Sequence, residues 1–301
     1  MLGSQIIDYA GSIAGYEVGL QEIERFGYAN FPSAVATGDS WNQHDGCEIV
    51  FLLQGEACWE IDGKLLLPLT GGNCAVFPAD RKHRIANGIY PPCNCFWIVL
   101  NKAATMDPAR PTLMGAKSLS SFERALGHYS LTQKISDVCL GSIGETLRLM
   151  KDKRLYSGAS LLVSELRAHL HLIMVETWKA HAEKQRNPAD TTLVSNVLSR
   201  LHEADDEFPT VSHLARELKC SRGHLHKSFT REIGMPPSDY AQRLRIKRAC
   251  SRLVMREQSI TNIALDSGFG SSQHFAKVFR KYIGLTPSEY RLQLREKALR
   301  Q

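Results

Sequence analysis

Hydrophobic positions follow two different spacings along this 301-residue chain. Between about residues 17 and 105, short apolar runs such as EIVFLL, ACWEI and CFWIVL alternate with polar or glycine-containing pairs. Asp62-Gly63 separates two of these runs, and Asp-Gly is a strong hairpin signal because both residues tolerate positive φ. Many short strands at even spacing predict a small antiparallel barrel or jelly roll.

From Ser118 to Gln185 the apolar residues recur every three or four positions, as they do on one face of a helix. The segment ASLLVSELRAHLHLIMVETW carries such a stripe, with Leu162, Leu166 and Leu170 in its first half. A stripe this broad packs either on the barrel or against the same helix of a second chain. We therefore expect helices between the barrel and the rest of the chain.

A twenty-residue pattern occurs twice near the C-terminus. SRGHLHKSFTREIGMPPSDY begins at Ser221, and SSQHFAKVFRKYIGLTPSEY begins at Ser271. With the residues before it, each copy predicts a short helix, a tight turn and a second helix, since apolar residues recur at i and i+4. The two serines stand where an N-cap hydroxyl accepts backbone N–H groups of the second helix. We expect two helix-turn-helix units.

The turns of the two units differ in one residue. Gly268 occupies the turn of the second copy, and the matching residue of the first copy is Lys219. Because glycine adopts positive φ without steric cost, we expect the first turn to be more strained. After each unit a further helix is predicted from Pro237 or Pro287, and TPSE from Thr286 matches a capping box.

Charge is distributed unevenly along the chain. From Phe208 to the last residue there are 18 Lys and Arg against 7 Asp and Glu, a net charge of +11, whereas the preceding residues carry −5. We therefore expect a polyanion to bind the residues from Phe208 onward and not the rest of the chain. The exposed positions of both second helices lack carboxylates, although a merely solvated helix usually mixes its signs. The residues that we expect to contact DNA are Ser221, Arg222, Gly223, His226, Lys227, Ser271, Ser272, Gln273, Ala276, Lys277 and Arg280.

The helix predicted between the two copies sets their separation. Its 18 to 20 residues span roughly 27–30 Å, close to the roughly 34 Å between successive major-groove openings on one face of B-DNA. One chain could therefore place two recognition helices in adjacent major-groove segments of double-stranded DNA. The basic run RLRIKR in this helix is either solvated surface or a DNA contact, and the sequence leaves both open.

The doubled unit, its connecting helix and the terminal PSEYR strongly resemble the DNA-binding domain of the AraC/XylS family of bacterial transcription regulators, over about residues 191–295. The resemblance implies that the third, sixth and seventh positions of each recognition helix face base edges. By their chemistry, Gln273 suits adenine and the two lysines suit guanine, while Arg222 and Arg280 suit phosphates. Gly223 departs from the larger side chain often found there. The implied base-facing residues are Gly223, His226 and Lys227, then Gln273, Ala276 and Lys277.

Two motifs in the strand-rich part resemble the two cupin motifs. HDGCEIVFLLQG supplies His44 and Glu48, and GNCAVFPADRKHRIAN supplies His83, with Asp80 at a usual glycine position. Asn42 stands where a metal-binding cupin has its first His. The remaining two-His, one-carboxylate triad suits Fe(II) or Mn(II), but regulators of this family usually bind an organic effector, often a sugar, without metal. We expect no cofactor, and the effector-binding candidates are Trp41, His44, Glu48, Trp59, His83 and Trp97.

Two alternatives remain open at this stage. One is a cupin metalloenzyme of the dioxygenase type fused to a DNA-binding module, although we expect no enzyme activity. The other is a sensor of metals or of redox state that uses the thiols of Cys93 and Cys95. Against it, we expect all eight cysteines to be free in a reducing cytosol.

No apolar run reaches the roughly 20 residues that cross a bilayer, and we expect a cytoplasmic protein without a membrane partner.

The sequence thus predicts a multidomain α+β protein. Its expected parts are a cupin-like effector-binding barrel or jelly roll over residues 1–110, a helical segment over 111–185, a linker over 186–190 and an all-α domain with two helix-turn-helix motifs over 191–301. The resemblance implies a homodimer formed through the helical segment. It also implies a transcription activator that contacts RNA polymerase. The effector and the operator sequence stay undetermined.

Overall fold

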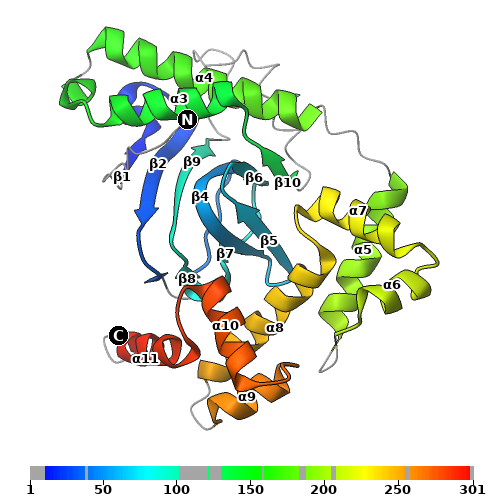
Figure 1. Cartoon of the computed structure of the whole chain (residues 1–301). Coiled ribbons are helices and arrows are strands. Elements are labelled where there is room, and N and C mark those ends of the chain that lie inside the picture. The colour runs from blue at the N-terminus through cyan, green and yellow to red at the C-terminus, as the bar shows by residue number, and fades with distance from the viewer. Residues whose placement is uncertain are drawn as a thin grey trace.

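The computed structural model describes residues 11–37, 40–101, 121–122, 130–157, 159–182, 188–204, 208–254 and 258–298. Residues 186 and 187 of the predicted linker lie outside these ranges, as do residues 111–120, 123–129, 158 and 183–185 of the predicted helical segment. The linker was predicted too long, because residues 188–190 already belong to a helix that begins at Pro188, and proline is favoured in the first turn of a helix. Figure 1 shows a strand-rich N-terminal part, two long helices across one end of the sheet, and a helical C-terminal part toward the opposite end. This arrangement matches the predicted α+β organisation.

The strand-rich part is built from antiparallel pairs. An eight-stranded sheet runs in the order β1-β2-β9-β4-β6-β10, with β5 and β7 also paired to β4, and β3 pairs with β8. The Asp62-Gly63 turn joins β4 to β5, and both residues have positive φ, which confirms the predicted hairpin. The strands are β1 (Gly11–Ala14), β2 (Ile23–Phe31), β3 (Val35–Ala36), β4 (Glu48–Ile61), β5 (Leu65–Thr70), β6 (Asn73–Phe77), β7 (His83–Ile85), β8 (Ile89–Tyr90), β9 (Cys93–Leu100) and β10 (Ser130–Lys134).

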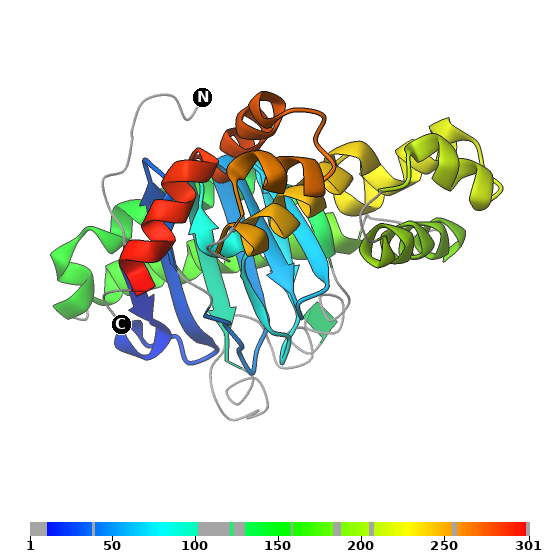
Figure 2. The same cartoon turned by 90° about the horizontal axis from the view of Figure 1, so that it is seen from below.

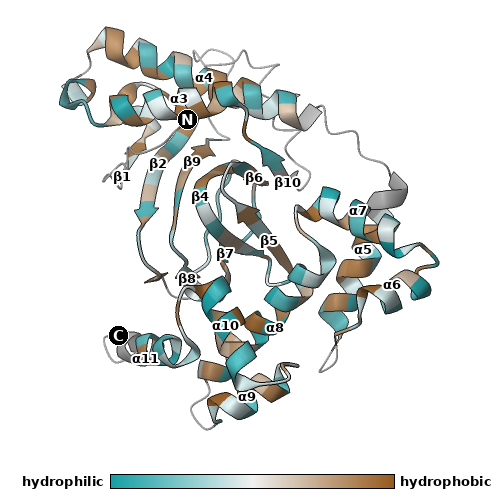
Figure 3. Ribbon diagram, viewed as in Figure 1, coloured by the Kyte–Doolittle hydropathy of each residue, from teal (hydrophilic) through white to brown (hydrophobic). Residues whose placement is uncertain are grey.

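Alternation along β4 separates two hydrophobic clusters. Ile49 and Phe51 pack with residues of the helices α3 (Asp137–Met150) and α4 (Ser160–Ala182). Val50 and Leu52 point to the other face and pack inside the barrel. This is the period-two pattern of a strand that is buried on both faces. In Figure 3, β5 is mostly apolar and β10 is mostly polar, while α3 and α4 alternate between apolar and polar segments, as amphipathic helices do.

One strand lies inside the segment that the sequence pattern assigns to helices. Strand β10 pairs antiparallel with β6, so Ser130–Lys134 extends the sheet. The local pattern is that of a strand, because Gln133 and Ile135 are buried and Lys134 between them is exposed. A strand this short does not stand out beside two long helical stripes, so the expectation of an entirely helical segment was wrong here.

The C-terminal part has two helical cores joined by one helix. Leu225 and Phe229 lie in the first core, and Phe275 and Phe279 lie in the second. The helix α8 (Pro237–Val254) contributes Tyr240 to the first core and further residues to the second. The structure thereby confirms the predicted doubled unit, which Figure 2 shows from below. The other helices are α5 (Pro188–Glu203), α6 (Val211–Glu217), α7 (Arg222–Ile233), α9 (Ile260–Asp266), α10 (Ser272–Ile283) and α11 (Pro287–Ala298).

Three short 3-10 helices complete the described chain: η1 (Gly15–Val18), η2 (Ala86–Gly88) and η3 (Lys153–Ser157). Among the described residues, no helix combines the length and apolar character that a membrane span requires. All eight cysteines are described, and each is a free thiol, as expected.

Candidate nucleic-acid interface and effector cavity

The two candidate recognition helices, α7 and α10, are fixed by the same local interactions. The Ser221 hydroxyl accepts the backbone N–H of His224 at 3.1 Å, and Ser271 accepts that of His274 at 3.2 Å. Both helices contain 12 residues and end at a left-handed glycine. Such N-caps and glycine C-caps stop a helix at defined residues, so the repeated sequence produces two helices of equal length.

The turns before these helices differ as the sequence predicts. Lys219 has φ of 51° and Gly268 has φ of 79°. A side chain in the left-handed region brings its Cβ close to the following carbonyl oxygen, at a cost of roughly 1–2 kcal/mol. The first unit therefore carries strain that the second avoids.

The predicted DNA-contacting residues lie on the outer faces of α7 and α10. Their neighbours Leu225 and Phe275 are fully buried, which fixes the rotation of each helix. A Cβ built on Gly223 meets nothing within 4 Å, so this position is open surface that offers no side chain. Ser272 and Ala276 are half-buried. The exposed ones are Ser221, Arg222, Gly223, His226, Lys227, Ser271, Gln273, Lys277 and Arg280.

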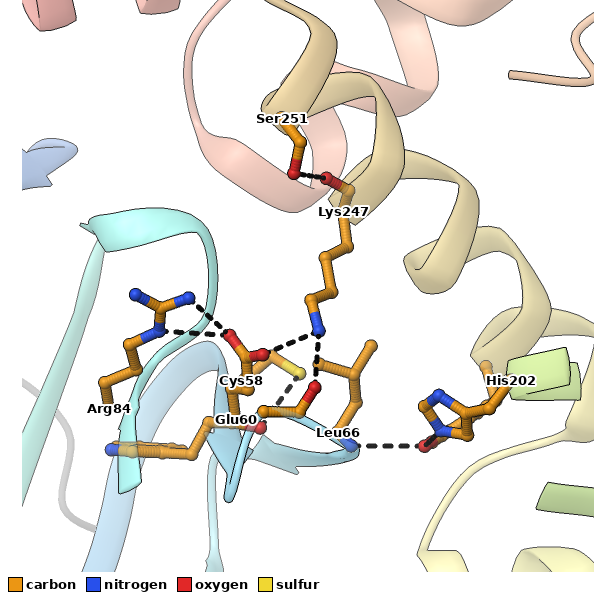
Figure 4. Close-up of polar contacts among 10 residues, drawn as sticks. Cys58, Glu60, Leu66, Arg84, His202, Lys247 and Ser251 are labelled. Atoms are coloured by element: carbon orange, nitrogen blue, oxygen red, sulfur yellow. Dashed lines mark hydrogen bonds and ion pairs between the residues drawn. The ribbon is translucent and has the colours of Figure 1, made fainter. Parts of the chain in front are cut away.

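The basic run of α8 faces the protein instead of solvent. Nη2 of Arg243 donates to Oε2 of Glu56 at 3.0 Å, and Nζ of Lys247 donates to Oε1 of Glu60 at 2.6 Å. Arg248 donates to the backbone carbonyl of Ala204. Figure 4 shows Lys247 reaching from α8 to Glu60 on β4. In this arrangement two cations of the run bind the effector domain, an outcome that the sequence did not indicate.

The strand-rich domain contains a cavity of about 340 Å³. Five of the six predicted effector-binding residues line it, and they come from different parts of the chain. The exception is Trp41, which is 37% exposed and stacks under the Arg84 guanidinium. Asn42, its neighbour, lines the cavity and pairs with His83 in a β-bridge, so Trp41 points to the opposite side. The five lining residues are His44, Glu48, Trp59, His83 and Trp97.

Glu48 is the polar centre of the cavity. Its Oε2 lies 2.6 Å from Nε2 of His83 and 3.4 Å from Nε2 of His44. Burial by itself raises the pKa of Glu48, but the hydrogen bonds from the two imidazoles outweigh it and lower the pKa to about 2. The hydrogen bond to Glu48 in turn raises the pKa of His44. At neutral pH the cavity therefore holds a carboxylate flanked by two imidazoles.

Aromatic rings form the walls around this carboxylate. Phe31 stacks on Tyr90 with ring centroids 4.4 Å apart, and Trp59 meets Tyr90 edge-on at 6.3 Å. On β9, alternation brings Cys95, Trp97 and Val99 to the same wall. Further polar or aromatic residues line the cavity that the sequence did not point to, although period-two alternation could have indicated some of them: Ser12, Glu24, Arg25, Phe31, Asn42 and Tyr90.

The cavity triad offers donors that fit a metal ion. The ligand atoms of His44, Glu48 and His83 lie within 4.8 Å of one another. Two imidazoles and one carboxylate match Fe(II) or Mn(II) in type, although Asn42 occupies the position of a further His. The hydrogen bonds already satisfy the Glu48 oxygen that both imidazoles contact, so the triad also holds together without a metal.

The cysteine pair on β9 has little thiolate character. Burial raises the pKa of Cys93 to about 12, and burial also raises the pKa of Cys95. Because the thiolate is the form that ligates metals and reacts with oxidants, neither thiol suits a metal or redox sensor in this environment.

Comparison with known proteins supports both parts. The family described as a helix-turn-helix domain matches residues 214–293, and the cupin domain family matches residues 33–99. The "HTH-type transcriptional activator RhaS" of Klebsiella pneumoniae is 24% identical over 236 residues, which are 78% of this chain and 81% of that protein. The "HTH-type transcriptional activator RhaR" of an Enterobacter species is 23% identical and covers 83% and 88% of the two chains.

Solved structures include an AraC-type transcriptional regulator from Chromobacterium violaceum. It is 30% identical, with a TM-score of 0.33, and the match covers 36% of this chain and 96% of that one. ToxT from Vibrio cholerae, solved with a bound unsaturated fatty acid, is 15% identical over 88% of this chain, with a TM-score of 0.32.

Proposed function

We propose that this chain, which joins an AraC-type helix-turn-helix domain to a cupin domain, is a transcription regulator that binds double-stranded DNA and responds to a small organic effector. The doubled unit carries the proposal. Helix α8 has 18 residues, a length of about 27 Å, and it holds α7 and α10 in separate cores at its two ends. Two recognition helices at the ends of a connector of that length suit two adjacent major-groove segments.

Lys227 and Lys277 are the residues on which we test base contact. Each is exposed, and each lies at the seventh position of its motif. We expect Lys227→Ala and Lys277→Ala each to weaken binding to a selected site by about 1–3 kcal/mol, as loss of a base contact does. Fluorescence anisotropy with a DNA site selected from a random library measures this.

The matched control is Lys64→Ala in the turn between β4 and β5, which removes the same charge from another exposed lysine outside the recognition helices. It should leave the affinity nearly unchanged. Equal affinities for the control and for both recognition-helix variants would contradict the assignment.

The cavity suits an effector with several hydroxyl groups, such as a sugar. The Glu48 carboxylate accepts hydrogen bonds from hydroxyls, and Trp59 and Trp97 offer aromatic faces to C–H surfaces. A panel of sugars and small metabolites, screened for thermal stabilisation of the full chain, tests this by mass action. A specific hit should lose its effect in Glu48→Gln. A hit that stabilises both proteins equally would place the effector elsewhere.

A metal-dependent role is the second candidate, because the donor atoms of His44, Glu48 and His83 converge. Metal analysis of the purified chain separates the two. Stoichiometric iron or manganese that disappears in Glu48→Gln would favour a metal sensor or a metalloenzyme. Substoichiometric metal in both proteins would leave the organic effector as the better proposal.

We propose further that the chain dimerises through α3 and α4. Leu161 is 77% exposed and Leu172 is 40% exposed, both on α4. Sedimentation of the wild type and of Leu172→Glu tests this. We expect the variant to shift to a monomer, and an unchanged dimer would contradict the proposal.

We propose that the chain activates transcription, because the relatives named above are activators. Activation implies contact with RNA polymerase, and both act in the cytoplasm, where transcription occurs.

A further inference from the structure

Residues 83–90 connect the cavity to the DNA-binding part, and we call them the coupling segment. They comprise β7, the 3-10 helix η2 and β8. Both ends of the segment face the cavity: His83 holds Glu48, and Tyr90 stacks on Phe31. A ligand that binds Glu48 therefore lies beside His83, at one end of this segment.

The middle of the coupling segment contacts both helix-turn-helix units. Ala86 belongs to the hydrophobic core of the first unit, and Ile89 belongs to the core of the second. The Tyr290 hydroxyl on α11 donates to the carbonyl oxygen of Asn87 at 3.0 Å. Eight residues thus join one cavity to the cores of both helix-turn-helix units, to which α8 also contributes.

The coupling segment also shares an ion-pair network with α8. Nε of Arg84 donates to Oε2 of Glu60, while Lys247 donates to Oε1 of the same carboxylate. Glu60 is 2% exposed, so this carboxylate depends on both cations for its solvation. Figure 4 shows Arg84 and Lys247 approaching Glu60 from two sides. Because Arg84 follows His83 directly, alternation sends one side chain to the cavity and the next to the α8 interface.

The centre of the coupling segment has an uncommon backbone. Asn87 has φ of 64° and Gly88 has φ of 67°. A left-handed residue other than glycine persists where surrounding contacts hold it, and here those contacts include Tyr290 from the DNA-binding part. The conformation of the segment and the docking of the helices therefore support each other.

We propose that the coupling segment transmits the state of the cavity to both helix-turn-helix units at once. In the conformation described here, the segment fastens both units to the effector domain, so a change at His83 or Tyr90 alters the docking of α8 and α11 together. The proposal rests on the cavity being the effector site of the proposed function. The test of the coupling uses neither effector nor DNA, so the coupling and the proposed function can fail separately.

The first arm of the test breaks one contact at the middle of the segment. Tyr290→Phe removes the hydroxyl that bonds Asn87, and Tyr282→Phe is the matched control, since that hydroxyl bonds Gln242 within the DNA-binding part. Hydrogen–deuterium exchange of the full chain is the measurement. We expect Tyr290→Phe to speed exchange over residues 83–90 by about 3- to 10-fold, as loss of one hydrogen bond does, and the control to leave it unchanged.

The second arm changes the cavity and measures hydrogen–deuterium exchange in α8 and α11. Ala29→Phe adds bulk to the cavity wall, and Tyr90→Phe removes only a hydroxyl should the larger change prevent folding. We expect exchange in α8 and α11 to change by about 2-fold or more, and Tyr290→Phe to diminish this response.

Exchange that changes only in the strands around the cavity, with α8 and α11 as in the wild type, would overturn the coupling. Equal effects of Tyr290→Phe and Tyr282→Phe on residues 83–90 would overturn it as well. Neither result depends on DNA binding. Failure of the chain to bind DNA would refute the proposed function, but the exchange experiment would still decide whether the segment couples the cavity to the helices.

Discussion

At the scale of single residues, Glu48 determines how the cavity responds to pH. Its folded pKa of about 2 lies below the ordinary value of 4.5, because hydrogen bonds from His44 and His83 outweigh burial. A carboxyl with a depressed pKa stabilises the fold above its unfolded pKa, and this contribution disappears as the pH falls through the folded pKa. The stabilisation is about 3 kcal/mol at most and should be lost between pH 5 and pH 2.

Urea unfolding of the wild type and of Glu48→Gln at several pH values tests this assignment. The free energy of unfolding should fall more steeply with acidification in the wild type, because the glutamine variant has no carboxyl to protonate at this position. Parallel curves for the two proteins between pH 5 and pH 2 would show that the carboxyl is not held in its ionised form.

Sequence patterns located this triad but not every lining residue. The resemblance to the two cupin motifs implied that His44, Glu48 and His83 lie together, and the structure places them so. Trp41 was assigned to the cavity for being aromatic, yet the bridge between Asn42 and His83 turns it outward. Composition identifies a candidate side chain, whereas strand register decides which way it points.

At the scale of elements, the two turns offer a matched experiment. Lys219 adopts φ of 51° at the position where the second unit has Gly268. We expect Lys219→Gly to relieve strain and raise the free energy of unfolding by up to about 1 kcal/mol, since the greater freedom of glycine in the unfolded chain offsets part of the gain. Gly268→Lys should lower it by about 1–2 kcal/mol. Chemical denaturation measures the free energy of unfolding of both variants. A lower value for Lys219→Gly would contradict the claim that Lys219 is strained.

Element boundaries in the DNA-binding part followed from the sequence, because caps act locally. Ser221 and Ser271 begin their helices as predicted, and Thr286 and Glu289 exchange the hydrogen bonds of a capping box. The partners of α8 did not follow. Arg243 and its neighbours could equally face DNA, solvent or carboxylates of another domain, and only tertiary structure selects among them.

At the scale of the whole molecule, the effector and DNA-binding parts share hydrophobic cores. Leu66 on β5 packs into the core of the first helix-turn-helix unit, while Leu67 beside it packs inside the barrel. We expect Leu66→Ala to speed hydrogen exchange in α7 and α8, and Leu67→Ala to act on the strands. Each should cost about 2–5 kcal/mol, because both side chains are buried.

This pair separates a shared core from general destabilisation. The two variants lose the same atoms from adjacent, equally buried positions, so a difference between their exchange patterns reports which core each leucine supports. Identical patterns in both variants would mean that the first unit does not depend on its contact with the effector domain.

The central claim is that one chain places α7 and α10 in neighbouring major-groove segments of one duplex. Hydroxyl-radical and methylation footprinting of the full chain, on a site selected from random DNA, tests it most directly. We predict two protected major-groove segments about one helical turn apart for each bound chain, with Lys227→Ala losing protection in one segment and Lys277→Ala losing it in the other. A single protected segment that both variants weaken alike would contradict the claim.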